Sequence, residues 1–476
     1  MSGDLITSGL AGTVSKATSS HDSRWGTRVI GAAMVVALSI AYVLDKNSAS
    51  GTHSPIVYLL CGVGLMLGVM LALSDVQSGM SLFLLVGCIS PRFGANFRLE
   101  DLLLPAIILA WIGRSSRGGQ FYLRTPVTIA ALLVALTMIL AFSWGLAQGT
   151  IPRPIDGIFI VFKRIEYILL FYLALNSVTS HEECTSLITT FLCGAVAASI
   201  IALGTAGADA SVGDTRATGL DDDNYNTFAG FLVIAASLSM AGALHYRGRA
   251  RTALAVVTLI LIGTLLKTYS REGYFILAVA LLLLGVMRYR ILIPVIILVT
   301  IGAQIVLPES VLMRVSDSVS EVKNYQHESS GTNSFTARVE GWNMRWHMVE
   351  NQPLLGNGPG SAPLHVDNEY LLRLIESGII GLSAFFLLLI SFWRYLRICS
   401  RKLARTVSEP FVYGLIAAFG AMLVQGTVAA AWSTIRTMEP FWILTGAIGG
   451  IIVHSRNRPT DEDQTASIDA VPAVVS

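Results

Sequence analysis

Apolar residues come in blocks whose length matches the thickness of a lipid bilayer. A transmembrane helix needs about 20 mostly apolar residues, with a range of about 17–25. Twelve blocks of roughly this length, and two shorter ones, are separated by polar connectors. The pattern predicts an all-α polytopic membrane protein with 12–14 transmembrane helices. The longer blocks are 29–44, 55–73, 126–146, 155–176, 187–206, 225–245, 252–268, 273–287, 290–307, 370–393, 411–433 and 438–453.

The two shorter blocks, 79–90 and 101–113, fall below the usual spanning length. They fit either a tight hairpin of short, mutually packed helices or a re-entrant pair, and their length does not decide whether they span fully. Both arrangements add an even number of crossings. The orientation of the remaining helices is therefore the same in either case.

Basic residues in the connectors fix the orientation, because cytoplasmic loops carry an excess of Lys and Arg. With a cytoplasmic N-terminus, the connectors and tails on that side hold 18 basic residues, whereas the short external loops hold seven. Both termini are therefore predicted to be cytoplasmic. The seven external residues are Lys46, Arg92, Arg98, Arg153, Arg216, Arg271 and Arg436.

Composition supports the membrane assignment and narrows the function. The 476 residues are 53% hydrophobic and 13% charged, against about 25% charged in soluble domains, which excludes a soluble enzyme and a disordered chain. Lys and Arg number 33 against 31 Asp and Glu, so no global field attracts nucleic acid. No Walker motif, dinucleotide-binding glycine motif or metal-like cysteine spacing is present. We therefore predict neither a cofactor nor a metal.

One connection, residues 308–369, is far longer than the others and lies on the external side. Loops of this length are uncommon unless they are functional. Residues 334–350 have helical periodicity, with Arg338, Trp342 and Arg345 on one stripe. Pro353 ends this helix, and glycines at 356, 358 and 360 follow. Such glycines fit either a cup of backbone amides for an anion or a plain turn.

These boundaries divide the chain into five parts. They are a cytoplasmic tail (1–28), transmembrane helices (29–307), the long external (periplasmic) loop with short helices (308–369), C-terminal transmembrane helices (370–453) and a disordered cytoplasmic tail (454–476).

Ionisable residues collect where the loop enters the next span. His365, Asp367, Asn368 and Tyr370 lie at the outer end of the 370–393 helix. Such a cluster is costly unless it faces a wet cavity. The alternative is a solvated helix start with Asp367 or Asn368 as its N-cap.

Further charges lie in or near other spans. Lys163, Arg164 and Glu166 occupy the 155–176 block, where Lys163 and Glu166 are one turn apart and can pair. These charges either stabilise helix packing or contact the substrate. The external loop at 207–224 holds Arg216 and the acidic run 221–223, which is either a solvated face or a metal site.

Several of these residues, in this order, resemble motifs of the O-antigen ligase/O-antigen polymerase superfamily, bacterial transferases of lipid-diphosphate-linked glycans. The resemblance covers roughly 265–385, and the remainder matches only in its helix pattern. The motifs are Tyr269-Ser270-Arg271-Glu272-Gly273, Arg338…Trp342, Pro353-Leu354-Leu355-Gly356-Asn357-Gly358-Pro359-Gly360, Asp367-Asn368-Glu369-Tyr370-Leu371…Gly378-Ile379-Ile380-Gly381-Leu382 and, more weakly, Phe162-Lys163-Arg164-Ile165-Glu166-Tyr167.

The chain departs from the ligase pattern at one position. Ligases that it resembles have a histidine directly before the Asn, whereas this chain has Asp367 there and His365 two residues earlier. Members with another residue at this position are more often polymerases of surface or exopolysaccharide. The resemblance therefore favours a polymerase over a lipid A–core ligase.

The resemblance implies a site for an undecaprenyl-diphosphate-linked donor at the outer face of the membrane. Arg271 and Arg338, with Arg345 beside them, would bind the diphosphate, because guanidinium groups match phosphate oxygens. Asp367, or otherwise His365, would act as general base, with Asn368 orienting the base or the acceptor. The remaining substrate contacts are expected from Arg216, Lys163, Arg164, Trp342 and Tyr370.

The leading hypothesis is a metal-independent glycosyltransferase that polymerises lipid-linked repeat units into a surface polysaccharide or exopolysaccharide at the bacterial cytoplasmic (inner) membrane. Its expected partners are membrane lipid, a flippase and a chain-length regulator. The alternatives are a ligase to lipid A–core or protein, and a transporter or flippase of lipid-linked glycan. A transporter would show paired repeats and interrupted helices, and neither is evident in the sequence.

Overall fold

A computed structural model describes residues 55–89, 92–93, 97–115, 121–122, 124–205, 216–218, 225–301, 334–362 and 366–455. The predicted first span, 29–44, therefore lies outside the described residues, as do the N-terminal tail and 456–476. The described helices are α2 (Pro55–Ser74), α3 (Val76–Ile89), α4 (Leu104–Ser115), α5 (Thr128–Gln148), α6 (Pro154–Ser177), α7 (His181–Thr205), α8 (Tyr225–His245), α9 (Gly248–Lys267), α10 (Arg271–Met287), α11 (Leu292–Ile301), α14 (Ser334–Asn351), α15 (Glu369–Lys402), α16 (Glu409–Gln425) and α17 (Ile435–Ser455).

The helices form the all-α membrane bundle that the apolar blocks predict. Within the described ranges, five helices are long and apolar enough to cross a membrane: α5, α7, α8, α9 and α15. Large apolar side chains cover outward faces, among them Ile129, Leu136 and Leu259, each more than half exposed. A soluble monomer rarely exposes apolar patches of this extent, so these faces suit lipid. The total of 12–14 spans remains a prediction.

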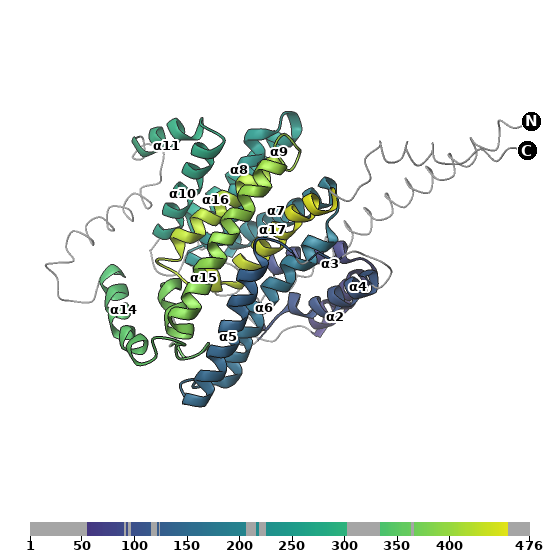
Figure 1. The fold of residues 1–476 in the computed structure, drawn as a ribbon. Coiled ribbons are helices and arrows are strands. Elements are labelled where there is room, and N and C mark those ends of the chain that lie inside the picture. Colours follow the sequence, from purple (N-terminus) through teal and green to yellow (C-terminus); the bar gives the residue numbers. More distant parts are fainter. Residues whose placement is uncertain are drawn as a thin grey trace, which may run out of the picture.

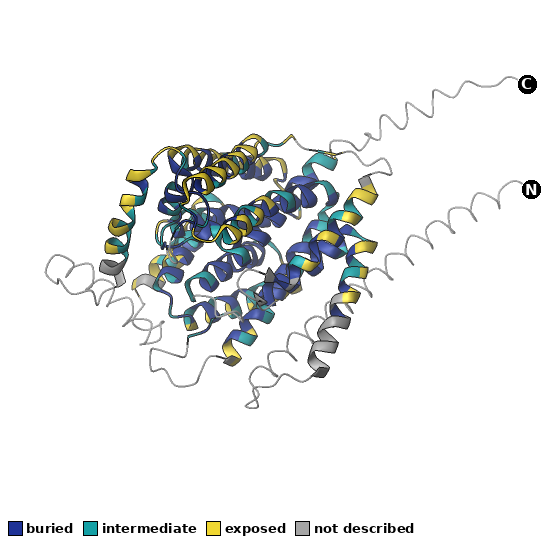
Figure 2. Ribbon diagram, turned by 90° about the horizontal axis from the view of Figure 1, so that it is seen from below, coloured by how far each residue is buried: buried dark blue, intermediate teal, exposed yellow. Residues whose placement is uncertain are grey.

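The bundle brings helices from distant parts of the sequence side by side (Figure 1). Helix α6 packs along α17, α15 along α5, and α8 against both α9 and α16. Buried positions line the interior of the bundle, and exposed ones lie on its periphery (Figure 2). Helix α14, in the long loop that is predicted to be external, lies beside the first turns of α15.

The two short blocks form mutually packed helices. Helices α3 and α4 contact each other and α2. Between α3 and α4 lie two antiparallel strands of two residues each, β1 (Arg92–Phe93) and β2 (Phe97–Arg98), and then the 3-10 turn η1 (Leu99–Leu102). Nearly every residue of α3 is buried, because α7 covers another of its faces.

Helix α15 is interrupted at Gly378, whose φ of 62° and ψ of −168° are non-helical. No interruption is evident in the sequence of this span, but the structure has one. The break frees carbonyls before Gly378 and amides after it, and the Pro353–Gly360 loop satisfies them. Asn357 N donates to Ile375 O at 2.8 Å, and Gly358 N donates to Glu376 O at 2.9 Å. In return, the amides of 379 and 380 donate to the carbonyls of 353 and 354.

The Pro353–Gly360 loop, called the glycine loop below, therefore satisfies backbone groups that the break in α15 leaves free. Glycines 356, 358 and 360 have φ of 72°, 91° and 86°, as a left-handed loop requires. The amides of 356, 357 and 358 are all bonded to backbone carbonyls, so the anion cup is wrong for these groups and the turn interpretation holds. The loop also packs onto the outer ends of α5 and α6, where Gly145 and Gly157 leave room for its backbone.

We expect Gly378→Ala to destabilise the protein more than any other single alanine in this region. A Cβ at Gly378 would lie 2.2 Å from Leu354 O, and its backbone conformation is essentially restricted to glycine, which costs of order 1–3 kcal/mol for other residues. Gly263→Ala is the matched control, because a Cβ there meets open space and alanine favours a helix. Thermal unfolding in detergent checks both variants, and equal midpoints would contradict this role of the glycine loop.

Candidate functional site

The outer cluster, as we call Arg338, Asp367 and Glu272, joins three elements at the end of the bundle where α10 and α15 begin. Arg338 Nε lies 3.8 Å from Asp367 Oδ2, and Arg338 Nη2 lies 3.8 Å from Glu272 Oε2. Arg338 comes from α14, Asp367 precedes α15, and Glu272 is in the first turn of α10. The Asp367 side chain is 46% exposed, whereas that of Glu272 is 4% exposed. The cluster is therefore open to solvent at Asp367 and buried at Glu272.

The turn between α9 and α10 holds the buried side of the outer cluster in place. Ser270 is the N-cap of α10, where its Oγ accepts from Gly273 N at 3.0 Å and contacts Asn226 Oδ1 at 2.6 Å. Gln425, at the end of α16, donates to Glu272 Oε1 at 2.8 Å and to Asn226 O at 3.3 Å. Helices α8, α10 and α16 therefore meet directly behind Glu272.

Arg271 opens α10, next to the outer cluster and partly buried. A helix N-terminus carries partial positive charge and unpaired amides, so it favours an anion nearby. Predicted diphosphate ligands Arg271 and Arg338 thus lie on α10 and α14, and Glu272 links the two elements. Arg345 differs, because its Nη1 donates to Gly341 O of its own helix at 2.9 Å.

Asn368 and Tyr370 have structural partners. Asn368 is the N-cap of α15, and its Oδ1 accepts from Leu371 N at 3.0 Å, so the helix-cap interpretation is confirmed for this residue. Tyr370 Oη donates to Leu423 O at 2.8 Å, and its ring stacks on Phe386. Asp367, one residue before the cap, keeps its carboxylate for Arg338.

Other predicted residues occupy the edge of this region. Trp342 packs on a small apolar cluster at the start of α15. The guanidinium of Arg216 lies 4.2 Å from the centre of the Tyr225 ring, and the next residue, Ala217, donates its amide to Lys267 O. Arg216 is thereby held at the outer ends of α8 and α9. His365 and the acidic run 221–223 lie outside the described residues.

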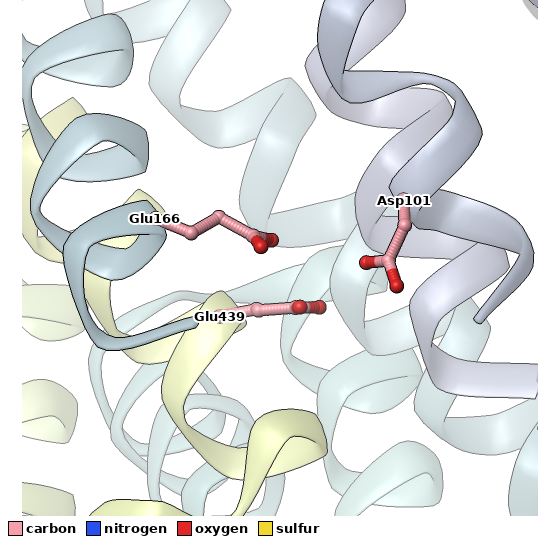
Figure 3. A group of neighbouring side chains, drawn as sticks. All are labelled: Asp101, Glu166 and Glu439. Atoms are coloured by element: carbon pink, nitrogen blue, oxygen red, sulfur yellow. The ribbon is translucent and has the colours of Figure 1, made fainter. Parts of the chain in front are cut away.

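A second group of charges is buried inside the bundle. Lys163 pairs with Glu166 at 3.0 Å, as predicted, and also contacts Asp101 and Glu439, the latter at 3.3 Å. The three carboxylates come from η1, α6 and α17 and point toward one another (Figure 3). Their oxygens lie within 4.8 Å of one another, close enough to hold a metal ion. The Lys163 ammonium, however, already supplies a cation to all three.

Two further buried pairs involve α15: one joins it to α6, and the other lies within its first turns. Arg164 Nη2 lies 2.6 Å from Glu376 Oε2, and Arg373 Nη2 lies 2.6 Å from Glu369 Oε1. Both guanidinium groups also reach Ser433 Oγ, at 3.4 Å each. We predicted Arg164 but missed its carboxylate partner. The i, i+4 spacing of Glu369 and Arg373 within an apolar span was the available signal.

Comparison with known families finds a similarity over part of the chain. Residues 256–386 match the family model described as O-antigen ligase. The matched segment contains α10, α14, the glycine loop and the first half of α15, and hence all three residues of the outer cluster. No curated protein matches the sequence. Over residues 256–386, this membrane protein is therefore similar to the O-antigen ligase family.

Proposed function

We propose that this protein polymerises undecaprenyl-diphosphate-linked oligosaccharide repeat units into a surface polysaccharide at the outer face of the cytoplasmic membrane. The observation that carries the proposal is the outer cluster, in which Arg338 from an extramembrane helix meets Asp367 at the head of a membrane helix. The cluster supports the proposal because it brings a guanidinium group, which can bind phosphate, next to a water-accessible carboxylate, inside the segment that matches the family model.

The chemistry follows from the charges of these two groups. The acceptor sugar hydroxyl attacks the anomeric carbon of the donor, and Asp367 takes the hydroxyl proton. The bond from that carbon to the diphosphate breaks, and its electron pair stays on the phosphate oxygen. Arg338 and Arg271 stabilise this developing anion, since fixed guanidinium groups need no reorganisation as charge appears. The diphosphate is both activating group and leaving group, so neither a nucleotide nor a metal enters the proposed step.

Arg338 has to change partners during this reaction. Its 3.8 Å contacts with Asp367 and Glu272 are longer than close ion pairs of 2.7–2.9 Å. A diphosphate can therefore displace Arg338 from Asp367 at small cost, while Gln425 continues to satisfy Glu272. Asp367 is then left facing water and the acceptor.

A ligase is the second candidate, because the matching family model is described as O-antigen ligase. Such an enzyme would use the same donor and the same outer cluster but pass the glycan to lipid A–core or to a protein. Asp367 stands where the ligase pattern has histidine, and this favours the polymerase. A flippase and a chain-length regulator are the partners that a polymerase would require.

A gel ladder of lipid-linked glycans tests the proposal. A strain that lacks this chain is expected to accumulate single repeat units, and the wild-type gene is expected to restore the ladder. A normal ladder that stays on the lipid carrier would identify a ligase instead. An unchanged ladder with unchanged transfer would exclude both enzymes and leave the transporter hypothesis.

A further inference from the structure

Eight basic side chains lie at the end of the bundle where α8, α10 and α15 end, the side predicted to be cytoplasmic (Figure 1). They belong to the α8–α9, α10–α11 and α15–α16 connections and the helix turns beside them. Two contacts join these connections: Tyr246 Oη donates to Val407 O at 2.5 Å, and Arg288 Nε lies 3.2 Å from Glu409 Oε1. All eight side chains are exposed. The residues of this basic patch are Arg247, Arg249, Arg251, Arg288, Arg290, Arg401, Lys402 and Arg405.

The basic patch carries more positive charge than the groups around it neutralise. Arg288 pairs with Glu409, whose other carboxylate oxygen accepts from Arg405 N at 2.9 Å. In the described part of the chain, no other side chain of the patch pairs with a carboxylate. Like charges held close together repel one another, so an anion from outside the chain would stabilise this arrangement.

The first turn of α7, which adjoins the patch, does not remove this excess. His181 Nδ1 contacts Ser408 Oγ at 2.9 Å, and this contact brings Glu182 and Glu183 to the edge of the patch. Glu183 Oε2 already accepts from the amide and the hydroxyl of Thr179. Even when these two carboxylates and that of the paired glutamate are counted, the eight basic groups exceed the three carboxylates by five charges.

Exposed apolar side chains border the basic patch on the same connections. Val286, Ile291 and Val407 are 63%, 61% and 57% exposed, and each lies within two residues of a patch residue in the sequence. Long basic side chains lay their stems along such apolar surface and keep their charges in water. A soluble acidic partner would match the charges but leave the apolar side chains in water, whereas a lipid with an anionic headgroup matches both.

We propose that the basic patch binds the headgroups of anionic phospholipids. Guanidinium groups offer a planar fork to phosphate oxygens, and the exposed apolar side chains beside them contact the acyl chains. Each basic residue near an anionic membrane surface contributes about fivefold to binding. The patch lies at the opposite end of α10 and α15 from the outer cluster, so this inference does not rest on the proposed function.

Native mass spectrometry of the full-length protein in detergent, titrated with short-chain lipids, tests the patch. Wild type is expected to bind dioctanoyl phosphatidylglycerol about tenfold more tightly than dioctanoyl phosphatidylcholine, and high salt should remove most of this preference. Arg249→Gln/Arg401→Gln is expected to weaken phosphatidylglycerol binding about 20–30-fold. Arg288 and Arg405 are left unchanged, because the first pairs with a buried glutamate and the second has a φ of 66°.

Arg114→Gln/Arg124→Gln is the matched control. Both residues are exposed and lie outside the patch, at the end of α4 and before α5, and the variant removes the same number of charges. It should change phosphatidylglycerol binding by less than about twofold, because exposed charges beyond the patch are screened. The thermal midpoints of wild type and both variants in lipid-free detergent should be equal, which separates lipid binding from folding.

Three results would overturn the proposal. Equal affinity for the two lipids would show that the headgroup charge is not recognised. Equal weakening in the two double variants would assign the binding to net charge rather than to the patch. Glycerol phosphate that binds as tightly as phosphatidylglycerol would show that the patch takes a soluble anion and not a lipid. None of these measurements involves a glycan, so they stand whether or not the ladder assay supports the proposed function.

Discussion

Arg338→Ala is expected to abolish polymer while the protein stays in the membrane. Arg338 is the cation of the outer cluster, and removing one preorganised donor to a developing oxyanion costs about 10²–10³ in rate. Arg338→Lys should recover only part of the activity, because lysine lacks the planar fork that binds phosphate oxygens in pairs. The rate of polymer formation from purified lipid-linked repeat units measures both variants.

A second substitution separates substrate binding from charge balance. Arg338→Ala also leaves Glu272 without its cation, and a buried carboxylate without a partner can disturb the fold. The double variant Arg338→Ala/Glu272→Gln removes that charge, and Gln425 can still bond to the new amide. We expect it to fold normally and remain inactive. Recovered polymer would mean that Arg338 only balances Glu272. Arg401→Ala, at the exposed C-terminal end of α15, should be silent.

The helices could be predicted from the sequence because lipid imposes a simple rule on each of them. The longer apolar blocks within the described residues each contain one α-helix, and the helix predicted at 334–350 ends at Asn351. The block 411–433 is the exception in length, because α16 ends at Gln425 and a separate 3-10 turn follows at Ala431–Ser433. The boundaries differ where helices continue past their apolar part. Helix α15 runs to Lys402 rather than 393, and α9 begins at Gly248 rather than 252, because polar and basic residues at the membrane surface continue the helical hydrogen bonding.

The break in α15 could not be predicted, since it depends on a loop from elsewhere in the chain. Gly378 and Gly381 are compatible with a continuous helix. The break is stable because the Pro353–Gly360 backbone forms hydrogen bonds with the groups that the break frees. The pairing of the buried charges likewise depends on residues that are distant in the sequence. Lys163 and Glu439 lie 276 residues apart, so no spacing rule connects them. Glu272 was visible in its motif, but its role depends on Gln425 and Arg338, which reach it from other helices.

The broken helix also bears on the transporter hypothesis. Transporters use unwound backbone to bind their substrates. In this protein, the carbonyls of 375 and 376 and the amides of 379 and 380 are bonded to the glycine loop. The charges inside the bundle pair with one another, as Lys163 does with three carboxylates. The outer cluster, by contrast, combines a cation with a half-exposed carboxylate, and this arrangement favours a transferase.

Asp367→Asn is expected to reduce the polymerisation rate about 10²–10⁴-fold, the usual contribution of a general base. The amide keeps the size of the side chain but cannot take the acceptor's proton. The fold should not change, because Asn368 supplies the N-cap of α15 and a partly exposed pair such as Asp367–Arg338 contributes at most about 1 kcal/mol. Initial rates with saturating donor, and the thermal midpoint of each variant, separate the two effects.

Asp367→His provides the complementary test. Histidine stands at this position in the ligases that the chain resembles, and an imidazole can also accept a proton. Asp367→His should therefore retain more activity than Asp367→Asn, with a rate that rises through the titration range of histidine as the ring loses its proton. Equal activity in wild type and Asp367→Asn would assign the proton transfer to His365. If Asp367→His also passed the glycan to a new acceptor, this single position would separate polymerase from ligase.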